Sequence, residues 1–294
     1  MEEVCHKLYK EDDTYLALWE YKKEVAKNAG TVFLNHGTYS NRKIMIGITE
    51  YLVRHGYHCW ILEWPEHGKS SMASYPYDFE TIGRDDFKLA IDYVRRHSSD
   101  DKIDVVAHSG GGICMTIFLC YYPAYQDYIG RMCFLATQAF AAYDGLVSKA
   151  KIRFGSIMMR LTGKSAGKFT GSPHDEKPAL MGQWFQWNMK REFTGRDGRD
   201  FKKCMADIKL PLLMLAGEGD TFIAPYDAME KYKDCFGSEA ELLLCGKATG
   251  FSENFSHGRI ALSSAAAREV YPLIFSWVKE GESAIEKIIH NAEN

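Results

Sequence analysis

Short apolar runs alternate along the chain with longer segments in which apolar residues recur at helical spacing. The runs predict strands at 14–21, 31–35, 57–64, 103–107, 131–136, 211–216 and 241–245. The longer segments predict helices at 42–55, 79–97, 111–122, 226–235 and 265–279. Strands that alternate with helices favour an α/β fold, with a mainly parallel central sheet that carries helices on both faces.

The alternation breaks down between residues 140 and 207. This region mixes helical pieces with glycine and lysine clusters and contains Trp184 and Trp187. Because it falls between two predicted strands, we interpret it as an insertion over the C-terminal edge of the sheet. Ligands bind at that edge in open α/β sheets. We therefore predict a core formed by 1–139 and 208–294, with 140–207 as a cap or lid.

Composition narrows the class of protein. The chain has 294 residues, of which 46% are hydrophobic, and this is enough for one large core with an insertion. Its 36 basic and 39 acidic residues give a formal net charge of −3, so there is no global charge that would attract nucleic acid. Eight scattered cysteines form no CxxC pair, which argues against a zinc site or a disulfide framework and favours a reducing, cytoplasmic setting.

Two segments bear on membrane targeting. The acidic N-terminal stretch MEEVCHKLYKEDD lacks an apolar signal region, so no signal peptide is expected. Residues 105–126 carry no Asp, Glu, Lys or Arg, but their continuous apolar part is about ten residues long, whereas a helix needs about 20 to span a bilayer. We expect a buried core helix there and no transmembrane segment.

The most informative motif is VVAHSGGGICM at 105–115. An apolar strand leads through small residues directly into an apolar helix, which is the context in which a nucleophilic serine is presented on a strained turn. Ala107, Gly110 and Gly111 supply the small neighbours that such a turn needs. We predict Ser109 as the nucleophile. A phosphate-binding loop is disfavoured, because no lysine follows the glycines and no GxGxxG pattern is present.

A serine hydroxyl needs a histidine to take its proton and an acid to orient that histidine. Asp220 ends the turn GEGD after one predicted strand, and His257 lies in the loop FSENFSHG after the next. We predict these as the acid and the base. The alternatives are a helix N-cap for Asp220 and a solvated loop histidine for His257. His108 is adjacent to the nucleophile and should point elsewhere, so we assign it to packing near the site.

Acyl transfer also needs hydrogen-bond donors for the developing oxyanion. The backbone N–H of Gly110, directly after the nucleophile, is one candidate. The turn His36-Gly37-Thr38 after an early strand offers the N–H of Thr38 as the second, or that of Tyr39 if the turn is shifted by one residue. An ordinary strand-end turn is the alternative interpretation.

The chain resembles the α/β-hydrolase superfamily over nearly its whole length. The matching pieces are NHG at 35–37, EWPEHGKS at 63–70, AHSGG at 107–111, GEGD at 217–220 and SHG at 256–258. They look most like the lysophospholipase and monoacylglycerol-lipase branch and small carboxylesterases. The resemblance implies a serine, an acid and a histidine in this order, and no cofactor or metal. Ala107 stands where glycine is commoner, and Glu63 and Pro65-Glu66 replace the Asp and Arg-Gly of the family pattern.

The predicted cap contains apolar and basic residues that bear on substrate. We predict Trp184 and Trp187 as substrate-binding; the alternative is that they pack the cap onto the sheet. Between Gly145 and His174 there are six basic residues and no acidic one, which suggests attraction of an anionic substrate or peripheral contact with anionic lipid through the segment 149–168. A solvated face is the alternative. The basic residues are Lys149, Lys151, Arg153, Arg160, Lys164 and Lys168.

Together these features predict a serine hydrolase that cleaves a carboxylic ester, with a small lipid-like or acyl ester as its substrate. An acyltransferase, thioesterase, lactonase or peptidase on the same scaffold is the alternative within enzymes. A non-catalytic binding protein that keeps the fold is the alternative outside them. The sequence carries no indication of oligomeric state.

Overall fold

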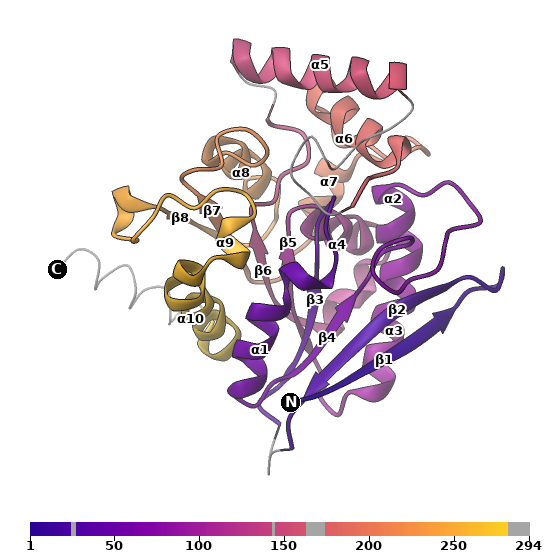
Figure 1. The fold of residues 1–294 in the computed structure, drawn as a ribbon, viewed down its shortest axis with the longest axis vertical. Helices are drawn as coiled ribbons and strands as arrows, with labels where there is room; N and C mark the ends of the chain where they lie inside the picture. Colours follow the sequence, from indigo (N-terminus) through magenta and orange to yellow (C-terminus); the bar gives the residue numbers. More distant parts are fainter. Residues whose placement is uncertain (25–27, 143–144, 163–173, 282–294) are drawn as a thin grey trace.

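The computed structural model describes residues 1–24, 28–142, 145–162 and 174–281. Its centre is an eight-stranded sheet with the order β1-β2-β4-β3-β5-β6-β7-β8 (Figure 1). The strands are β1 Glu2–Tyr9, β2 Tyr15–Lys22, β3 Thr31–Asn35, β4 His58–Leu62, β5 Ile103–His108, β6 Ile129–Leu135, β7 Leu212–Gly217 and β8 Ala240–Cys245. Strands β4, β3, β5, β6, β7 and β8 are parallel, so the predicted α/β architecture is confirmed.

The first strand was not among those predicted from the sequence. β1 pairs with β2 antiparallel, and β2 pairs with β4 antiparallel. Most β1 side chains are exposed or half-buried, so the strand lacks the dense apolar run that identifies the central strands. The formation of β1 at this edge of the sheet therefore depends on its pairing with β2 rather than on its own apolar pattern.

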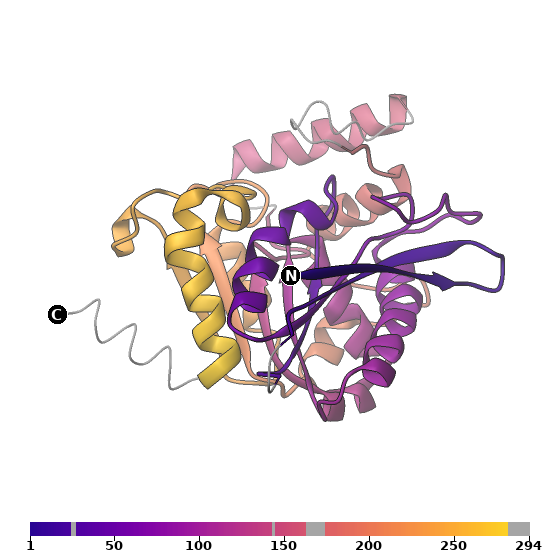
Figure 2. The ribbon, with the colours of Figure 1, turned by 60° about the horizontal axis from the view of Figure 1, so that its bottom comes forward.

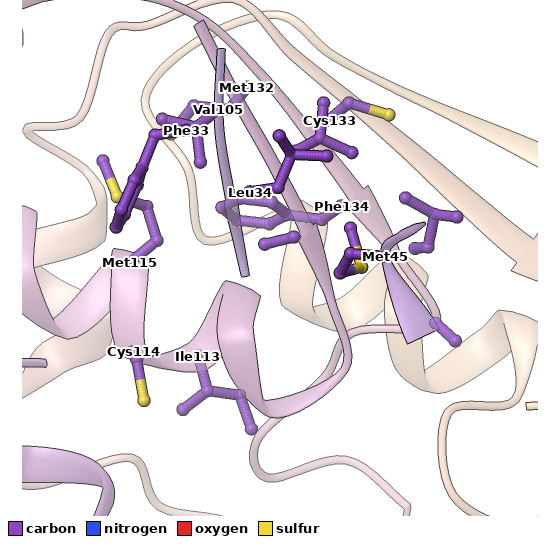
Figure 3. Packing of buried hydrophobic residues seen from close by; sticks show 14 of the residues in the cluster. Phe33, Leu34, Met45, Val105, Ile113, Cys114, Met115, Met132, Cys133 and Phe134 are labelled. Carbon is purple, nitrogen blue, oxygen red and sulfur yellow. The ribbon is translucent and has the colours of Figure 1, made fainter. Parts of the chain in front are cut away.

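Helices cover both faces of the sheet (Figure 2). α1 Ile46–Arg54 packs with α9 Arg259–Leu262 and α10 Ser264–Glu280, while α3 Phe87–His97 packs with α4 Gly110–Tyr121. Phe33 of β3 contacts Phe87 of α3, and Figure 3 shows the next residue, Leu34, pointing to the side of Met45. This period-two alternation buries apolar side chains on both faces of β3, as expected for a central parallel strand.

The predicted helix at 79–97 is divided in the structure. α2 Phe79–Thr81 and α3 are joined by a π-helical turn, η2 Ile82–Asp86. This turn packs closely against α4: a Cβ at Gly83 would lie 2.7 Å from the carbonyl oxygen of Cys114. In the described part of the chain, short 3₁₀ segments are found at η1 Arg42–Ile44, η3 Pro123–Tyr128 and η5 Lys247–Thr249. α8 Tyr226–Lys233 packs against β7 and β8.

Among the described residues between β6 and β7 lie the helices α5 Leu146–Thr162, α6 Pro178–Lys190 and α7 Phe201–Met205. In Figures 1 and 2, α5 lies at the outer edge of the molecule, with α6 between it and the sheet. The boundaries of a cap at 140–207 stay a prediction. In the described part of the chain, no helix is both long and apolar enough to cross a membrane.

Candidate active site

The turn between β5 and α4 holds Ser109 in a strained backbone conformation. Its φ of 53° and ψ of −119° lie outside the regions that L-residues ordinarily adopt. Neighbouring backbone approaches so closely that side chains would not fit: a Cβ at Gly37 would lie 2.7 Å from Cβ of Ser109, and one at Gly111 would lie 2.7 Å from the carbonyl oxygen of His36. The small residues around Ser109 therefore permit the sharp turn that presents its hydroxyl.

The structure brings Ser109, His257 and Asp220 together from three separate loops. Oγ of Ser109 lies 2.9 Å from Nε2 of His257, and Nδ1 of the same ring lies 2.6 Å from Oδ2 of Asp220. Ser109 and Asp220 are buried, at 8% and 5% exposure. This arrangement allows His257 to accept the hydroxyl proton while Asp220 fixes the orientation of its ring.

Asp220 makes the contacts expected of both roles that the sequence offered as alternatives. Its carboxylate accepts hydrogen bonds from the backbone N–H groups of Ile223, at 3.0 Å, and Ala224, at 3.1 Å, as a capping residue does. It also contacts His257. Burial acts to raise the pKa of Asp220, but the hydrogen bond and charge of His257 and these amides hold the pKa below its usual value. The carboxyl is therefore ionised at neutral pH.

His108, next to Ser109, contacts the loop that carries His257. Its Nε2 donates to the backbone carbonyl of His257 at 2.8 Å. Burial and the neighbouring His257 lower the pKa of His108 to about 3, so its ring is neutral at physiological pH. His108 accordingly fixes the backbone of the loop that carries His257 rather than exchanging protons with substrate.

The turn after β3 lies beside Ser109. Thr38 and Gly110 both line the cavity in front of the serine. The N–H of Tyr39, which was the alternative to Thr38, donates to Oε1 of Glu176 at 2.6 Å. Because this N–H already has an acceptor, the structure favours Thr38 over Tyr39 as a donor to substrate.

Glu176 is a residue that sequence reasoning missed. It is 4% exposed and contacts Nε2 of His67 at 3.1 Å as well as the N–H of Tyr39. Its second oxygen, Oε2, is buried and has no hydrogen-bond partner among the described residues. The available signal was its position: Asp175 and Glu176 are the first acidic residues after the basic stretch that begins at 145.

His67 carries a positive charge beside Glu176. Its Nδ1 donates to the carbonyl of Pro65 at 2.8 Å, so contact of Nε2 with the carboxylate requires a proton on both ring nitrogens. Burial acts to lower the pKa of His67, but the hydrogen bond and charge of Glu176 raise it above the usual value. The resulting buried ion pair links the β6–β7 chain to the segment after β4. The hydrogen bond from the Tyr39 N–H links the same carboxylate to the turn that carries Thr38.

A cavity of about 660 Å³ opens in front of Ser109. Its wall combines the catalytic-site candidates with apolar side chains from several elements. Trp184 of α6 lines it, and its substrate-binding role stays a prediction. Trp187 does not line the cavity: it is buried, donates from Nε1 to the carbonyl of Thr194 at 2.9 Å and packs against Phe193. The prediction of Trp187 as substrate-binding is therefore corrected, because α6 turns this side chain toward the core. Other apolar lining residues are Ile44, Phe79, Ile113, Met181, Phe185 and Phe222.

One lysine lines this cavity, and a second lies near one of its lining residues. Lys43 contributes to the lining, and Nζ of Lys151 lies 5.0 Å from the centroid of the Phe222 ring. Of the predicted basic segment, Lys164 and Lys168 lie outside the described residues. Within the residues that the structure describes, no group of three or more His, Cys, Asp or Glu side chains is arranged to hold a metal ion.

Comparison with known proteins identifies the fold. The family model of the alpha/beta hydrolase fold matches residues 30–156. An esterase from Thermogutta terrifontis superposes with a TM-score of 0.60 at 16% identity, covering 96% of this chain and 99% of that one. A bromoperoxidase from Bacillus anthracis gives 0.64 at 16% identity, covering 95% and 100%. An esterase from Exiguobacterium antarcticum gives 0.64 at 14% identity, covering 93% and 99%. No curated protein matches the sequence significantly.

Proposed function

We propose that this chain, whose residues 30–156 match the family model of the alpha/beta hydrolase fold, is a serine hydrolase that cleaves carboxylic esters. The observation that carries the proposal is the hydrogen-bonded chain from Ser109 through His257 to Asp220, with both contacts at 2.9 Å or less. Two of the similar structures named above are esterases, which agrees with this activity.

In the proposed reaction, Oγ of Ser109 attacks the ester carbonyl while Nε2 of His257 takes its proton. The tetrahedral oxyanion accepts hydrogen bonds from the N–H groups of Gly110 and Thr38, and loss of one such donor costs about 10²–10³ in rate in other enzymes. His257 then protonates the leaving alkoxide, which departs as an alcohol and leaves an acyl group on Ser109. Water, deprotonated by His257, hydrolyses the acyl-enzyme and restores the serine.

The cavity supports a substrate with an apolar acyl or aromatic part. Met181, Trp184 and Phe185 of α6 provide an apolar wall facing the serine, and flexible apolar linings suit acyl chains. Lys43 at the cavity and Lys151 beside Phe222 support a substrate that also carries negative charge. We therefore propose a small lipid-like or carboxylate-bearing ester.

We also propose that residues 140–207 act as a cap. α6 lies between the cavity and α5, and Glu176 connects this part of the chain to the turn at Tyr39. A cap fixed at this point would shape the substrate site without supplying the nucleophile, the base or the acid.

The test is hydrolysis of p-nitrophenyl esters of increasing acyl length by the wild type and by Ser109→Ala. We expect release of p-nitrophenol by the wild type, a preference among acyl lengths set by the 660 Å³ cavity, and loss of turnover in the variant. A neutral and an anionic ester of similar size, compared over a range of salt concentrations, test the charge proposal. Equal and salt-independent rates would remove it, whereas turnover that survives Ser109→Ala would overturn the proposed hydrolase.

A further inference from the structure

The outer face of α5 exposes a row of large apolar side chains. Val147, Phe154, Ile157 and Leu161 lie at the spacing that places residues on one side of a helix, and their exposed fractions are 68%, 66%, 55% and 76%. We call these four residues the outer row. Leu146 and Met158 are exposed beside it. These six side chains are more than half of the eleven exposed large hydrophobic residues found in the described part of the chain.

The opposite side of α5 is the one that packs on the protein. Ile152, Ser156 and Met159 are buried, and they recur at helical spacing out of phase with the outer row. α5 packs against α6, where a Cβ at Gly155 would lie 3.0 Å from the ring of Phe185. The helix therefore already has its packing partner on one side, and the outer row is apolar surface beyond what the fold needs. Exposed apolar patches of this kind mark interaction sites.

The charges on α5 all have one sign. Residues 145–162 contain Lys149, Lys151, Arg153 and Arg160 and no Asp or Glu. Lys151, Arg153 and Arg160 are exposed, and helical spacing places Arg153 and Arg160 on one flank of the outer row and Lys151 on the other. An apolar row between basic flanks is the pattern of helices that lie in the interface of anionic membranes.

We propose that the outer row of α5 docks on the surface of an anionic lipid bilayer. Phe154 and Leu161 would enter the headgroup and acyl boundary, and the basic flanks would contact lipid phosphates and carboxylates. A second copy of this chain on the same face would bring two sets of lysine and arginine side chains together, and like charges oppose such contact. Charge complementarity therefore selects an anionic lipid surface over self-association.

Docking in this orientation bears on the substrate site. Lys151 of α5 lies over the ring of Phe222, and Phe222 lines the cavity in front of Ser109. α6, directly beneath α5, contributes Met181, Trp184 and Phe185 to the same cavity. A docked α5 would place this cavity near the lipid surface. That consequence rests on the proposed hydrolase function, whereas the docking itself does not.

The experiment is co-sedimentation of the full chain with vesicles of phosphatidylcholine alone and of phosphatidylcholine with phosphatidylglycerol. Binding is measured in the Ser109→Ala background, so that lipid hydrolysis cannot change the vesicles. We expect binding to the phosphatidylglycerol vesicles only, reduced in roughly 0.5 M salt, which screens surface charges. Hydrolysis of a water-soluble ester is measured separately in the Ser109-containing protein, so that failure of binding and failure of catalysis are distinguished.

Two variant pairs locate the binding surface. Phe154→Ser/Leu161→Ser should lower the partition constant about ten-fold or more, because both side chains lose their apolar contact with lipid. The control Tyr9→Ser/Met72→Ser removes side chains of similar exposure elsewhere and should leave binding unchanged. Lys151→Gln/Arg160→Gln should weaken binding and flatten its salt dependence, whereas Lys203→Gln/Lys247→Gln, at other exposed positions, should not.

Three outcomes would overturn the proposal. The first is no binding to anionic vesicles by a protein that still hydrolyses a soluble ester. The second is unchanged binding by the Phe154→Ser/Leu161→Ser variant, with folding verified by circular dichroism and thermal unfolding. The third is a dimer in sedimentation velocity that the same two substitutions dissociate, which would assign the outer row to a second copy of the chain.

Discussion

α4 and α5 are both rich in apolar residues, but the protein places them in opposite environments. The first eleven residues of α4 are all buried, and the helix lies between the sheet and its neighbours directly behind Ser109. α5 buries little more than one row of side chains on α6 and exposes its apolar residues on the outside. The difference teaches that apolar content identifies a helix but not its task. α4 supports the turn that carries Ser109, whereas α5 exposes an apolar surface.

The same contrast extends to the regions around these helices. The sheet edge supplies Ser109, Asp220 and His257, each on a loop directly joined to core elements. The β6–β7 chain supplies part of the cavity wall and one buried carboxylate, Glu176, that reaches the turn at Tyr39. Substitutions at the sheet edge should therefore affect the rate of the chemical step most strongly, and substitutions in α5 should affect binding and leave the fold intact.

After Ser109→Ala, the largest effect on activity is expected at Asp220. Asp220→Asn removes the charge that orients His257, so kcat/KM on a p-nitrophenyl ester should fall by about 10³–10⁴, by analogy with the effect of this change in other triads. The N–H groups of Ile223 and Ala224 donate to different oxygens of the carboxylate, so the single amide oxygen can keep only one of these hydrogen bonds. The free energy of unfolding should therefore fall by only about 1 kcal/mol. A rate within a factor of about ten of the wild type would remove Asp220 from the proposed mechanism.

The two helices can be compared directly with matched phenylalanine substitutions. Phe118→Ala in α4 leaves a cavity in a fully buried site and should lower the free energy of unfolding by about 3–5 kcal/mol. Phe154→Ala in α5 removes a side chain that is 66% exposed and should change it by less than about 0.5 kcal/mol. Urea unfolding of both variants measures the difference. Similar losses in the two would contradict the contrast between a supporting helix and a surface helix.

Substitution of Glu176 tests whether the β6–β7 chain also affects kcat. Glu176→Ala frees the turn at Tyr39 and leaves the charge of His67 without its partner, so kcat should fall by about 10², with a smaller change in KM. Glu176→Gln keeps an acceptor for the Tyr39 N–H and should recover most of kcat. This rescue distinguishes positioning of the turn from general destabilisation.

The control for Glu176 is Lys177→Ala, which breaks the 2.8 Å ion pair between Lys177 and Glu66 without touching the turn at Tyr39. It should leave kcat within a factor of about two. Equal loss of kcat in Glu176→Ala and Lys177→Ala would show that the attachment of this chain, and not the contact with Tyr39, matters.

The smallest expected effect is on the pH dependence of the free energy of unfolding, which arises from the buried histidines behind Ser109. Burial lowers the pKa of His108 to about 3 and holds the pKa of His36 well below its usual value, while both protonate near pH 6.5 in the unfolded chain. Below pH 6.5 the unfolded state therefore binds more protons than the folded state, and stability falls with falling pH by up to about 1.4 kcal/mol per pH unit for each histidine.

Urea unfolding between pH 6.5 and 5 measures this dependence. His108→Gln should give a shallower loss of stability on acidification than the wild type, and His55→Gln, at an exposed position, should match the wild type. The His67–Glu176 pair acts in the opposite direction: the raised pKa of His67 means that its contribution is complete below pH 6.5 and is lost as the pH rises through the folded-state value. An identical slope in His108→Gln and wild type would contradict the assignment of a neutral, buried His108.

The sequence was sufficient for the features that depend on local pattern. Apolar runs located the central strands, and the strand-to-helix motif located the strained turn at Ser109, since both arise from residues close in the chain. Asp220 and His257 could be selected because each follows a strand of the same sheet, whose C-terminal ends meet at one edge.

Features that depend on contacts between distant segments could not be predicted in the same way. β1 lacks a dense apolar run and exists through its pairing with β2. The π-helical turn at 82–86 follows from close packing on α4, and Trp187 points to the core because of the rotation of α6. Glu176 lies 137 residues from Tyr39, so no local pattern connects the two.

Labelling with a fluorophosphonate probe tests the central claim, an activated Ser109, most directly. The activated hydroxyl attacks phosphorus and displaces fluoride, and mass spectrometry of the tryptic peptide 103–131 locates the adduct. We predict one adduct at Ser109 in the native protein, none after heat denaturation or in Ser109→Ala, and much slower labelling in His257→Gln. A folded protein that is not labelled, or that is labelled equally fast without Ser109 or His257, would contradict the account.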